Sequence, residues 1–311
     1  MTTQTCTIPV ATTWEWHSPA EEALTKGPQK VRIIEEYDQV VHRFMLTDDA
    51  TGKIFLLDDE PWNPDWHLDE YPAEKNGLIL EELDPSHIFP AYDPSTMTKY
   101  QGPVKGDPSV FIKTQQTLKR KAWTKEGCPD KHAQLVRREV SRCEFLFRAP
   151  SHHNIAQYKG VVVDAWNRVT GIAYKRYSMD LCQYVRSKHT IEMRHVEQIC
   201  EFVQQGVDRL HSLGMVHCDL RPPNVFITVD EDGSITEVVA GDFDAMHRVG
   251  ESIALKSPTG HKLWWPKDVQ WGDAARVEID GFALKGLRRW LTWIVEGGDA
   301  ELDEESKSSL M

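Results

Sequence analysis

The chain has 311 residues, of which 40% are hydrophobic, and it carries a formal net charge of −12. This length and apolar content suffice for a domain of two lobes with an extension, while the acidic charge argues against nonspecific binding to nucleic acids or acidic membranes. We therefore expect no nucleic-acid partner and no membrane partner. Six scattered cysteines without a C-x-x-C pair are typical of free thiols in a reducing compartment. The sequence also has no apolar run of the length of a membrane span or of the signal-peptide kind, which predicts an intracellular protein, cytoplasmic or nuclear.

The first 76 residues are expected to form an N-terminal extension. Two apolar runs, at residues 39–46 and 53–57, predict strands, and the turn residues between them predict a β-hairpin. Trp62 and Trp66 follow in a stretch rich in Asp and Pro. They either pack on the neighbouring domain or form a partner site.

Apolar periodicity predicts alternating strands and helices in the rest of the chain. Residues 109–113 are typical of a strand with Lys113 and Phe111 on one face, and residues 133–147 of a helix. The later elements, in chain order, are strands at 158–163 and 171–177, a helix at 191–213, a hairpin of 225–227 and 235–239, and a helix at 282–295.

Two short motifs follow apolar runs in the second half of the chain. Residues 217–224 are His-Cys-Asp-Leu-Arg-Pro-Pro-Asn, and residues 241–244 are Gly-Asp-Phe-Asp. Taken singly, an Asp or Asn in such a stretch is typical of turn or cap chemistry. Together and in this order, the two motifs resemble the H-R-D-L-x-x-x-N catalytic loop and the D-F-G segment of protein kinases. The chain is thus similar to the protein kinase-like superfamily over about residues 77–298, and it resembles small divergent fungal protein kinase domain proteins.

This resemblance implies an α+β, two-lobed, protein-kinase-like fold. A sheet-rich N-lobe would cover about residues 77–175, and a helical C-lobe about residues 176–298, truncated after the helix at 282–295. Residues 299–311 would form an acidic polar tail. ATP would bind between the lobes.

The resemblance also implies roles for the residues of the two motifs. Phosphoryl transfer requires an oriented nucleophile and neutralised phosphate charge. Asp219 would accept the proton of the incoming hydroxyl, and Arg221 would supply positive charge near the transferred phosphate, where these enzymes usually carry a Lys. Asn224 and Asp242 would hold Mg²⁺ against the phosphates of ATP.

A further implied contact is an ion pair between Lys113, which would bind the nucleotide, and a Glu on the following helix. The helix offers Glu139 and Glu144. We favour Glu139, because apolar residues lie beside it at helical spacing. Either glutamate could instead lie on a solvated helix face.

Three more roles follow from the same resemblance. Lys175, Arg176 and Tyr177 would run into the hinge that contacts adenine. His217 would pack under the Phe of the second motif. Asp280 would bind the backbone of the catalytic loop, although an acidic residue near a helix N-terminus is also common without such a role.

The expected nucleotide loop departs from the family pattern. No G-x-G-x-x-G precedes Lys113. The counterpart is residues 79–92, where Asp84 would place negative charge near phosphates and Pro85 lacks an N–H. These replacements favour a low affinity for ATP.

Three further replacements affect the parts that support catalysis. Cys218 stands where the family carries an Arg that answers a phosphate on the activation loop, which argues against that switch. Asp244 replaces the Gly of D-F-G and adds charge beside the metal site. Lys267 stands at the Glu of A-P-E.

These patterns favour a divergent ATP-dependent protein kinase, Ser/Thr-type, that transfers the γ-phosphate to a protein hydroxyl. One alternative is a pseudokinase that serves as a nucleotide-binding or scaffold module. The other is a small-molecule kinase on the same fold, whose partner would be a small-molecule acceptor instead of a protein substrate.

Overall fold

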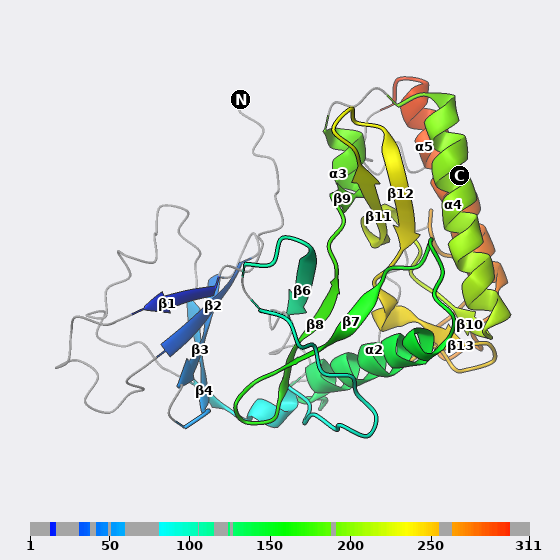
Figure 1. The fold of residues 1–311 in the computed structure, drawn as a ribbon. Helices are drawn as coiled ribbons and strands as arrows, with labels where there is room; N and C mark the ends of the chain where they lie inside the picture. The colour runs from blue at the N-terminus through cyan, green and yellow to red at the C-terminus, as the bar shows by residue number, and fades with distance from the viewer. Residues whose placement is uncertain are drawn as a thin grey trace. The chain divides into compact units, whose positions relative to one another are not determined.

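The computed structural model describes residues 13–16, 31–37, 42–48, 51–59, 81–104, 106–114, 124, 127–187, 191–254 and 263–298. The chain divides into two compact units (Figure 1). One unit comprises residues 1–92, 114–134 and 163–170, and the other comprises residues 93–113, 135–162 and 171–311. The predictions for Trp62, Trp66 and the tail at 299–311 lie outside the described residues.

The first unit contains a five-stranded antiparallel sheet with the strands in sequence order. The strands are β1 (Thr13–Trp16), β2 (Val31–Tyr37), β3 (His42–Asp48), β4 (Ile54–Asp59) and β5 (Glu81–Leu83). Strands β3 and β4 overlap the two runs of the predicted hairpin, with ends that differ by one to three residues, whereas β1, β2 and β5 are additional strands. Leu83, Ile88 and Phe89 are buried with Ile54 in a small apolar cluster.

The segment after β5 forms the 3₁₀ helix η2 (Pro85–His87). Asp84 caps it, since its carboxylate accepts the N–H of Ser86 at 2.9 Å. Hydrogen bonds from the side chain and from the backbone of Ser86 lower the pKa of Asp84. The turn predicted to replace a Gly-rich loop is therefore a capped helical turn with an ionised carboxylate.

A three-stranded sheet in the order β6-β8-β7 and the helix α2 belong for the most part to the second unit. Their bounds are β6 (Val110–Thr114), α2 (Lys131–Arg148), β7 (Tyr158–Val163) and β8 (Val169–Lys175). Val136, Val140 and Cys143 are at most 1% exposed, and their spacing of four and three residues gives α2 one apolar face. The predicted strands and helix are confirmed, with ends that differ by at most two residues.

The remaining elements of the second unit are mainly helical, with two small sheets of order β12-β11-β9 and β10-β13. They are β9 (Met179–Asp180), α3 (Leu181–Arg186), α4 (Met193–Ser212), β10 (Met215–Val216), η3 (Pro222–Asn224), β11 (Val225–Val229), β12 (Ile235–Ala240), η4 (Phe243–Ala245), β13 (His247–Arg248) and α5 (Glu278–Val295).

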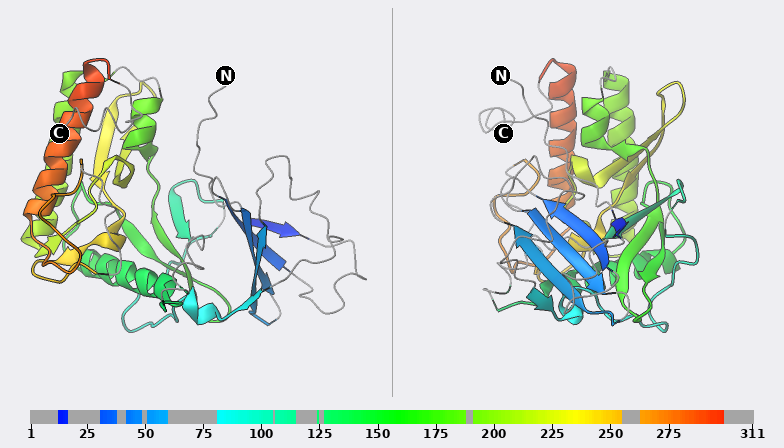
Figure 2. Two further views of the ribbon diagram at one scale, coloured as in Figure 1. Left: turned by 180° about the vertical axis from the view of Figure 1, so that it is seen from behind. Right: turned by 90° about the vertical axis from the view of Figure 1, so that its left-hand side faces the viewer.

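Helices α4 and α5 form the core of this part, and they lie side by side in both views (Figure 2). The apolar stripe predicted on α4 is fully buried at Val196, Ile199, Val203, Val207 and Leu210. Burying one such side chain contributes about 1.5–3 kcal/mol. Helix α5 begins four residues before the predicted Phe282, because Glu278 and Asp280 occupy its first turn, where acidic side chains are favourable.

The mixed α+β fold confirms the predicted fold class. The predicted domain boundaries at residues 76 and 298 stay predictions. The cysteines of the described segments are free thiols. Among the helices described here, none is both long and apolar enough to cross a membrane.

Candidate active site

The 217–224 loop, between β10 and β11, is held by a buried carboxylate of α5. Asp280 is fully buried, and its two oxygens accept the N–H groups of His217 at 2.8 Å and Cys218 at 2.9 Å. His211 Nε2 lies 2.9 Å from the same carboxylate. Cys218 has a φ of 61°, which a non-glycine residue rarely adopts. The geometry thus gives Asp280 the contact with the loop backbone that the sequence pattern predicted.

Asp280→Ala is expected to lower the free energy of unfolding by about 2–3 kcal/mol, because two buried N–H groups would lose their acceptor. Asp280→Asn keeps one acceptor oxygen and should lose less. Urea denaturation of the two variants and the wild type measures the difference. An unchanged stability in Asp280→Ala would contradict the anchoring role.

Two polar side chains of the same loop, those of Asn224 and Arg221, both contact Asp219. Asn224 Nδ2 donates to the main-chain oxygen of Asp219 at 2.7 Å and to its Oδ2 at 3.1 Å. Arg221 Nε lies 3.2 Å from Asp219 Oδ1. Asp219 is 8% exposed and Asn224 3%. The loop therefore presents one carboxylate, held by an amide and a guanidinium.

The 241–244 motif is joined to this loop through main-chain hydrogen bonds. The N–H of Gly241 donates to Asn224 O at 2.9 Å, and Gly241 O lies 2.9 Å from His217 Nε2. The rings of His217 and Phe243 pack with their centroids 5.8 Å apart, as predicted. Asp242, which lies between Gly241 and Phe243 in the chain, has a φ of 62°.

Lys113 of β6 is surrounded by carboxylates from two other elements. Its Nζ lies 2.9 and 2.8 Å from the two oxygens of Glu139, 2.6 Å from Asp242 Oδ1 and 3.8 Å from Asp244 Oδ2. Burial by itself would lower the pKa of Lys113, but the charges of Asp242, Glu139 and Asp244 raise it well above its ordinary value. The ammonium is therefore protonated and neutralises part of the acidic charge.

Of the two glutamates left open by the sequence, Glu139 is the one that contacts Lys113. Glu144 accepts hydrogen bonds from the N–H and hydroxyl of Thr98 and from the hydroxyl of Tyr158. Tyr174 holds Glu139 from the other side, since its hydroxyl donates to Oε1 at 2.7 Å. No local sequence pattern points to Tyr174, because nothing in a strand residue indicates a partner 35 positions away.

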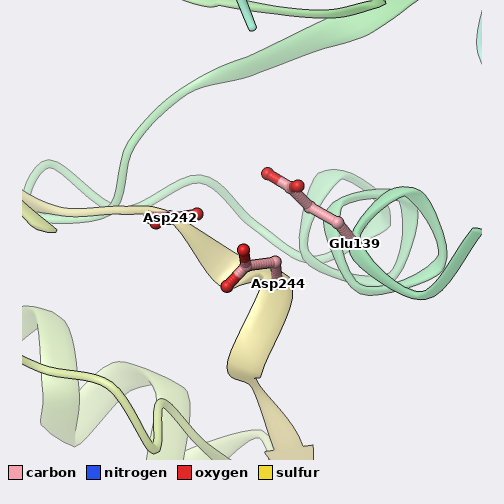
Figure 3. Close-up of side chains that lie close together, drawn as sticks. All are labelled: Glu139, Asp242 and Asp244. Atoms are coloured by element: carbon pink, nitrogen blue, oxygen red, sulfur yellow. The ribbon is translucent and has the colours of Figure 1, made fainter. Parts of the chain in front are cut away.

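Glu139, Asp242 and Asp244 gather at one point, as Figure 3 shows. Each places a carboxylate oxygen within 4.8 Å of the others. Carboxylate oxygens are the ligands that Mg²⁺ prefers. In the folded chain the ammonium of Lys113 lies among these three carboxylates, and Asp242 is the one of them that the motif also predicts as a metal ligand.

Comparison with known proteins agrees with this geometry. Residues 109–285, more than half of the chain, match the family model described as the protein kinase domain. The chain belongs to the protein kinase domain family. Members of this family generally use ATP and a divalent metal ion.

Individual relatives match this kinase domain at low identity. A serine/threonine-protein kinase US3 homolog of varicella-zoster virus is 29% identical over 32% of this chain and 24% of its own length. The probable serine/threonine-protein kinase fhkB of Dictyostelium discoideum is 25% identical over 47% of this chain and 12% of its own. Mitogen-activated protein kinase 6 of Arabidopsis thaliana is 28% identical over 30% and 24%. The chain spans about a quarter or less of these curated relatives, and the narrower likeness to fungal proteins stays a prediction.

The three side chains predicted to approach adenine each contact another protein group of the kinase domain. Lys175 Nζ pairs with Glu237 at 2.6 Å. The guanidinium of Arg176 lies over the ring of Phe111, 5.7 Å from its centroid. Tyr177 stacks on the ring of Phe226 at 6.0 Å, and its hydroxyl accepts the N–H of Gln157 at 3.0 Å. A nucleotide contact from this run would therefore come from main-chain groups, and it stays a prediction.

Asp244, at the Gly position of the kinase D-F-G segment, adds a third carboxylate beside Lys113. This carboxylate would compete with a nucleotide phosphate for the ammonium. We expect Asp244→Asn, which removes only the charge, to bind ATP about three- to tenfold more tightly at low Mg²⁺, since an opposite charge at this distance is a strong interaction in a partly buried site. Calorimetric titration with ATP measures the effect. Weaker binding in the variant would mean that Asp244 takes part in holding the cation.

Proposed function

We propose that this chain is an ATP-dependent protein kinase of the Ser/Thr type, which transfers the γ-phosphate of ATP to a hydroxyl of a protein substrate. The observation that carries the proposal is the position of Lys113, with Glu139 and Asp242 at 2.6 to 2.9 Å from its ammonium. These groups come from three separate elements. Holding a partly buried cation among carboxylates costs desolvation free energy, so this arrangement supports a role beyond packing.

Other observations support the same activity. The names of two relatives, each a serine/threonine-protein kinase or a probable one, favour the Ser/Thr type. Asp219 and Asn224 are in contact within the loop that the family uses for catalysis. Arg221 lies beside this carboxylate and would supply positive charge at the transferred phosphate.

In the proposed reaction, the oxygen of the substrate hydroxyl bonds to the γ-phosphorus while the bond from that phosphorus to the bridging oxygen breaks and ADP leaves. Asp219 would accept the hydroxyl proton as the new bond forms. Asn224 and Arg221 would keep its carboxylate oriented toward the acceptor. Lys113 would neutralise charge on the ATP phosphates, with Glu139 and Tyr174 fixing the position of its ammonium.

Asp242 and Asn224 are the proposed ligands of Mg²⁺. When bound, the metal ion neutralises the charge of the phosphates. A carboxylate and an amide oxygen are suitable donors for it.

A pseudokinase is the second candidate function, and Asp244 favours it. Its carboxylate places additional negative charge at the ammonium that would otherwise bind phosphate. Such a domain would bind nucleotide weakly and act through interaction.

Two measurements on one sample test the proposal: the melting temperature with and without Mg-ATP, and transfer of labelled phosphate from ATP to a generic protein acceptor and to the chain itself. A rise in melting temperature with labelled product is the expected result. A rise without product would favour the pseudokinase, and no rise at millimolar nucleotide would contradict ATP binding.

A further inference from the structure

Two arginines of α2 face the segment that follows the 241–244 motif. Arg138 and Arg142 are one helical turn apart, so they share a face of the helix. Arg142 Nη2 lies 2.7 and 2.5 Å from the two carboxylate oxygens of Glu251, and Arg138 Nη2 lies 3.8 Å from the first of them. The side chain of Arg142 is 12% exposed, and that of Arg138 is 9% exposed. The two guanidinium groups are thus largely withdrawn from water, whereas the Glu251 side chain is 33% exposed. Hydrogen bonds between charged groups are stronger than those between neutral groups.

The same arginines also bind the main chain of this segment. The oxygen of Met246 accepts Arg138 Nη2 at 3.0 Å and Arg142 Nε at 3.3 Å. The oxygen of Ala254 accepts Arg138 Nη1 at 3.3 Å. Residues 246–254 are therefore fixed to α2 at both ends and at Glu251.

Glu251 is an integral part of the segment. One of its oxygens accepts the N–H of Arg248 at 2.7 Å. Burial alone would raise the pKa of Glu251, but this hydrogen bond and the charges of Arg142 and Arg138 lower it. Glu251 is therefore ionised at neutral pH, where its charge attracts both arginines.

The pairs of Arg138 and Arg142 with Glu251 supply an ionic contact to arginine that the catalytic loop lacks. Cys218 occupies the position of the family's phosphate-binding Arg, and burial raises the pKa of its thiol, so this residue brings no charge to the loop. A phosphate that orders such a segment acts by forming new ionic hydrogen bonds to arginines. Here the arginine donors already hold a carboxylate.

We propose that Glu251, Arg138 and Arg142 form a built-in clamp that positions α2, and with it Glu139 against Lys113, without phosphorylation of the segment. The inference rests on the proposed kinase function and deepens it by naming how the site is kept assembled. Glu251 and Arg142 are positioning residues, because they act through α2 and touch no reacting atom.

Glu251→Gln tests the clamp because it removes the charge and keeps the shape. We expect kcat/KM for ATP to fall about tenfold, since a hydrogen bond to a charged group is lost at a partly buried site. We also expect amide hydrogen exchange in α2 and in residues 246–254 to become about tenfold faster, while exchange in α5 stays unchanged. Wild-type protein treated with a phosphatase, and shown by mass spectrometry to carry no phosphate, should keep its full rate.

Asp268→Asn is the matched control, because it removes a carboxylate from an exposed ion pair with Arg276. It should change neither readout. Arg142→Lys is the second variant if Glu251→Gln is poorly folded: it keeps the charge but loses the fork that reaches both Glu251 and Met246, and it should give a smaller fall.

The outcomes separate the clamp from the kinase activity. A phosphatase-treated wild type that loses its rate, or a Glu251→Gln variant with wild-type exchange in α2, would overturn the clamp. If the wild type transfers no phosphate but the variant still loosens α2 and residues 246–254, the proposed function fails while the clamp stands as a structural device.

Discussion

Asp219→Asn is expected to lower the rate of phosphate transfer by about a thousandfold, because general-base catalysis is worth about 10²–10⁴-fold and an amide cannot accept the proton. The affinity for ATP should stay nearly unchanged. Asp219 contacts Asn224 and Arg221 within its own loop, and Lys113 binds the other motif. Single-turnover transfer and a nucleotide titration on the same preparation measure the two quantities.

The fold of this variant is checked by its melting temperature. An Asn at position 219 keeps one side-chain oxygen, which can still accept the hydrogen bond from Asn224 Nδ2. The melting temperature should therefore change little. Transfer at the wild-type rate would remove Asp219 from the mechanism, whereas a large loss of ATP affinity would place it at the nucleotide.

Lys113→Met is expected to reduce transfer by about a hundredfold or more, because one preorganised charge at a phosphate is typically worth 10²–10³-fold. It should also weaken ATP binding. In addition, the variant leaves Glu139, Asp242 and Asp244 together without their shared cation, so it should be less stable at neutral pH.

Acidification distinguishes this effect from lost packing. Carboxylates that have lost their cation bind protons more readily, so the stability of Lys113→Met should rise relative to the wild type as the pH is lowered from 7 towards 5. Melting curves over this range provide the measurement. A variant with wild-type stability and wild-type ATP affinity would show that Lys113 has no role in the site.

The local parts of the site could be predicted from the sequence because each is encoded within a few residues. The 217–224 and 241–244 motifs have fixed spacing, and Lys113 ends an apolar strand run. The sequence alone does not decide between Glu139 and Glu144 as the partner of Lys113. They are five positions apart, about 140° around a helix, so each faces a different neighbour. The packing of α2 against β6 and β8 decides which of the two glutamates reaches Lys113.

Contacts between distant segments could not be predicted in this way. Arg142 and Glu251 are 109 positions apart, and neither lies in a motif. Lys175 and Tyr177 contact Glu237 and Phe226, partners that only the folded sheet brings near, and their nucleotide role stays a prediction. In each case the deciding partner is set by tertiary packing and leaves no local pattern.

Cys218 and Asp242 both have left-handed backbone conformations, one in each motif. For side chains other than glycine this costs about 1 kcal/mol per residue. A screen for heat tolerance alone would thus favour glycine or asparagine at both positions. On the proposed function, the aspartate at 242 keeps this less stable backbone conformation because its carboxylate pairs with Lys113 and would hold Mg²⁺.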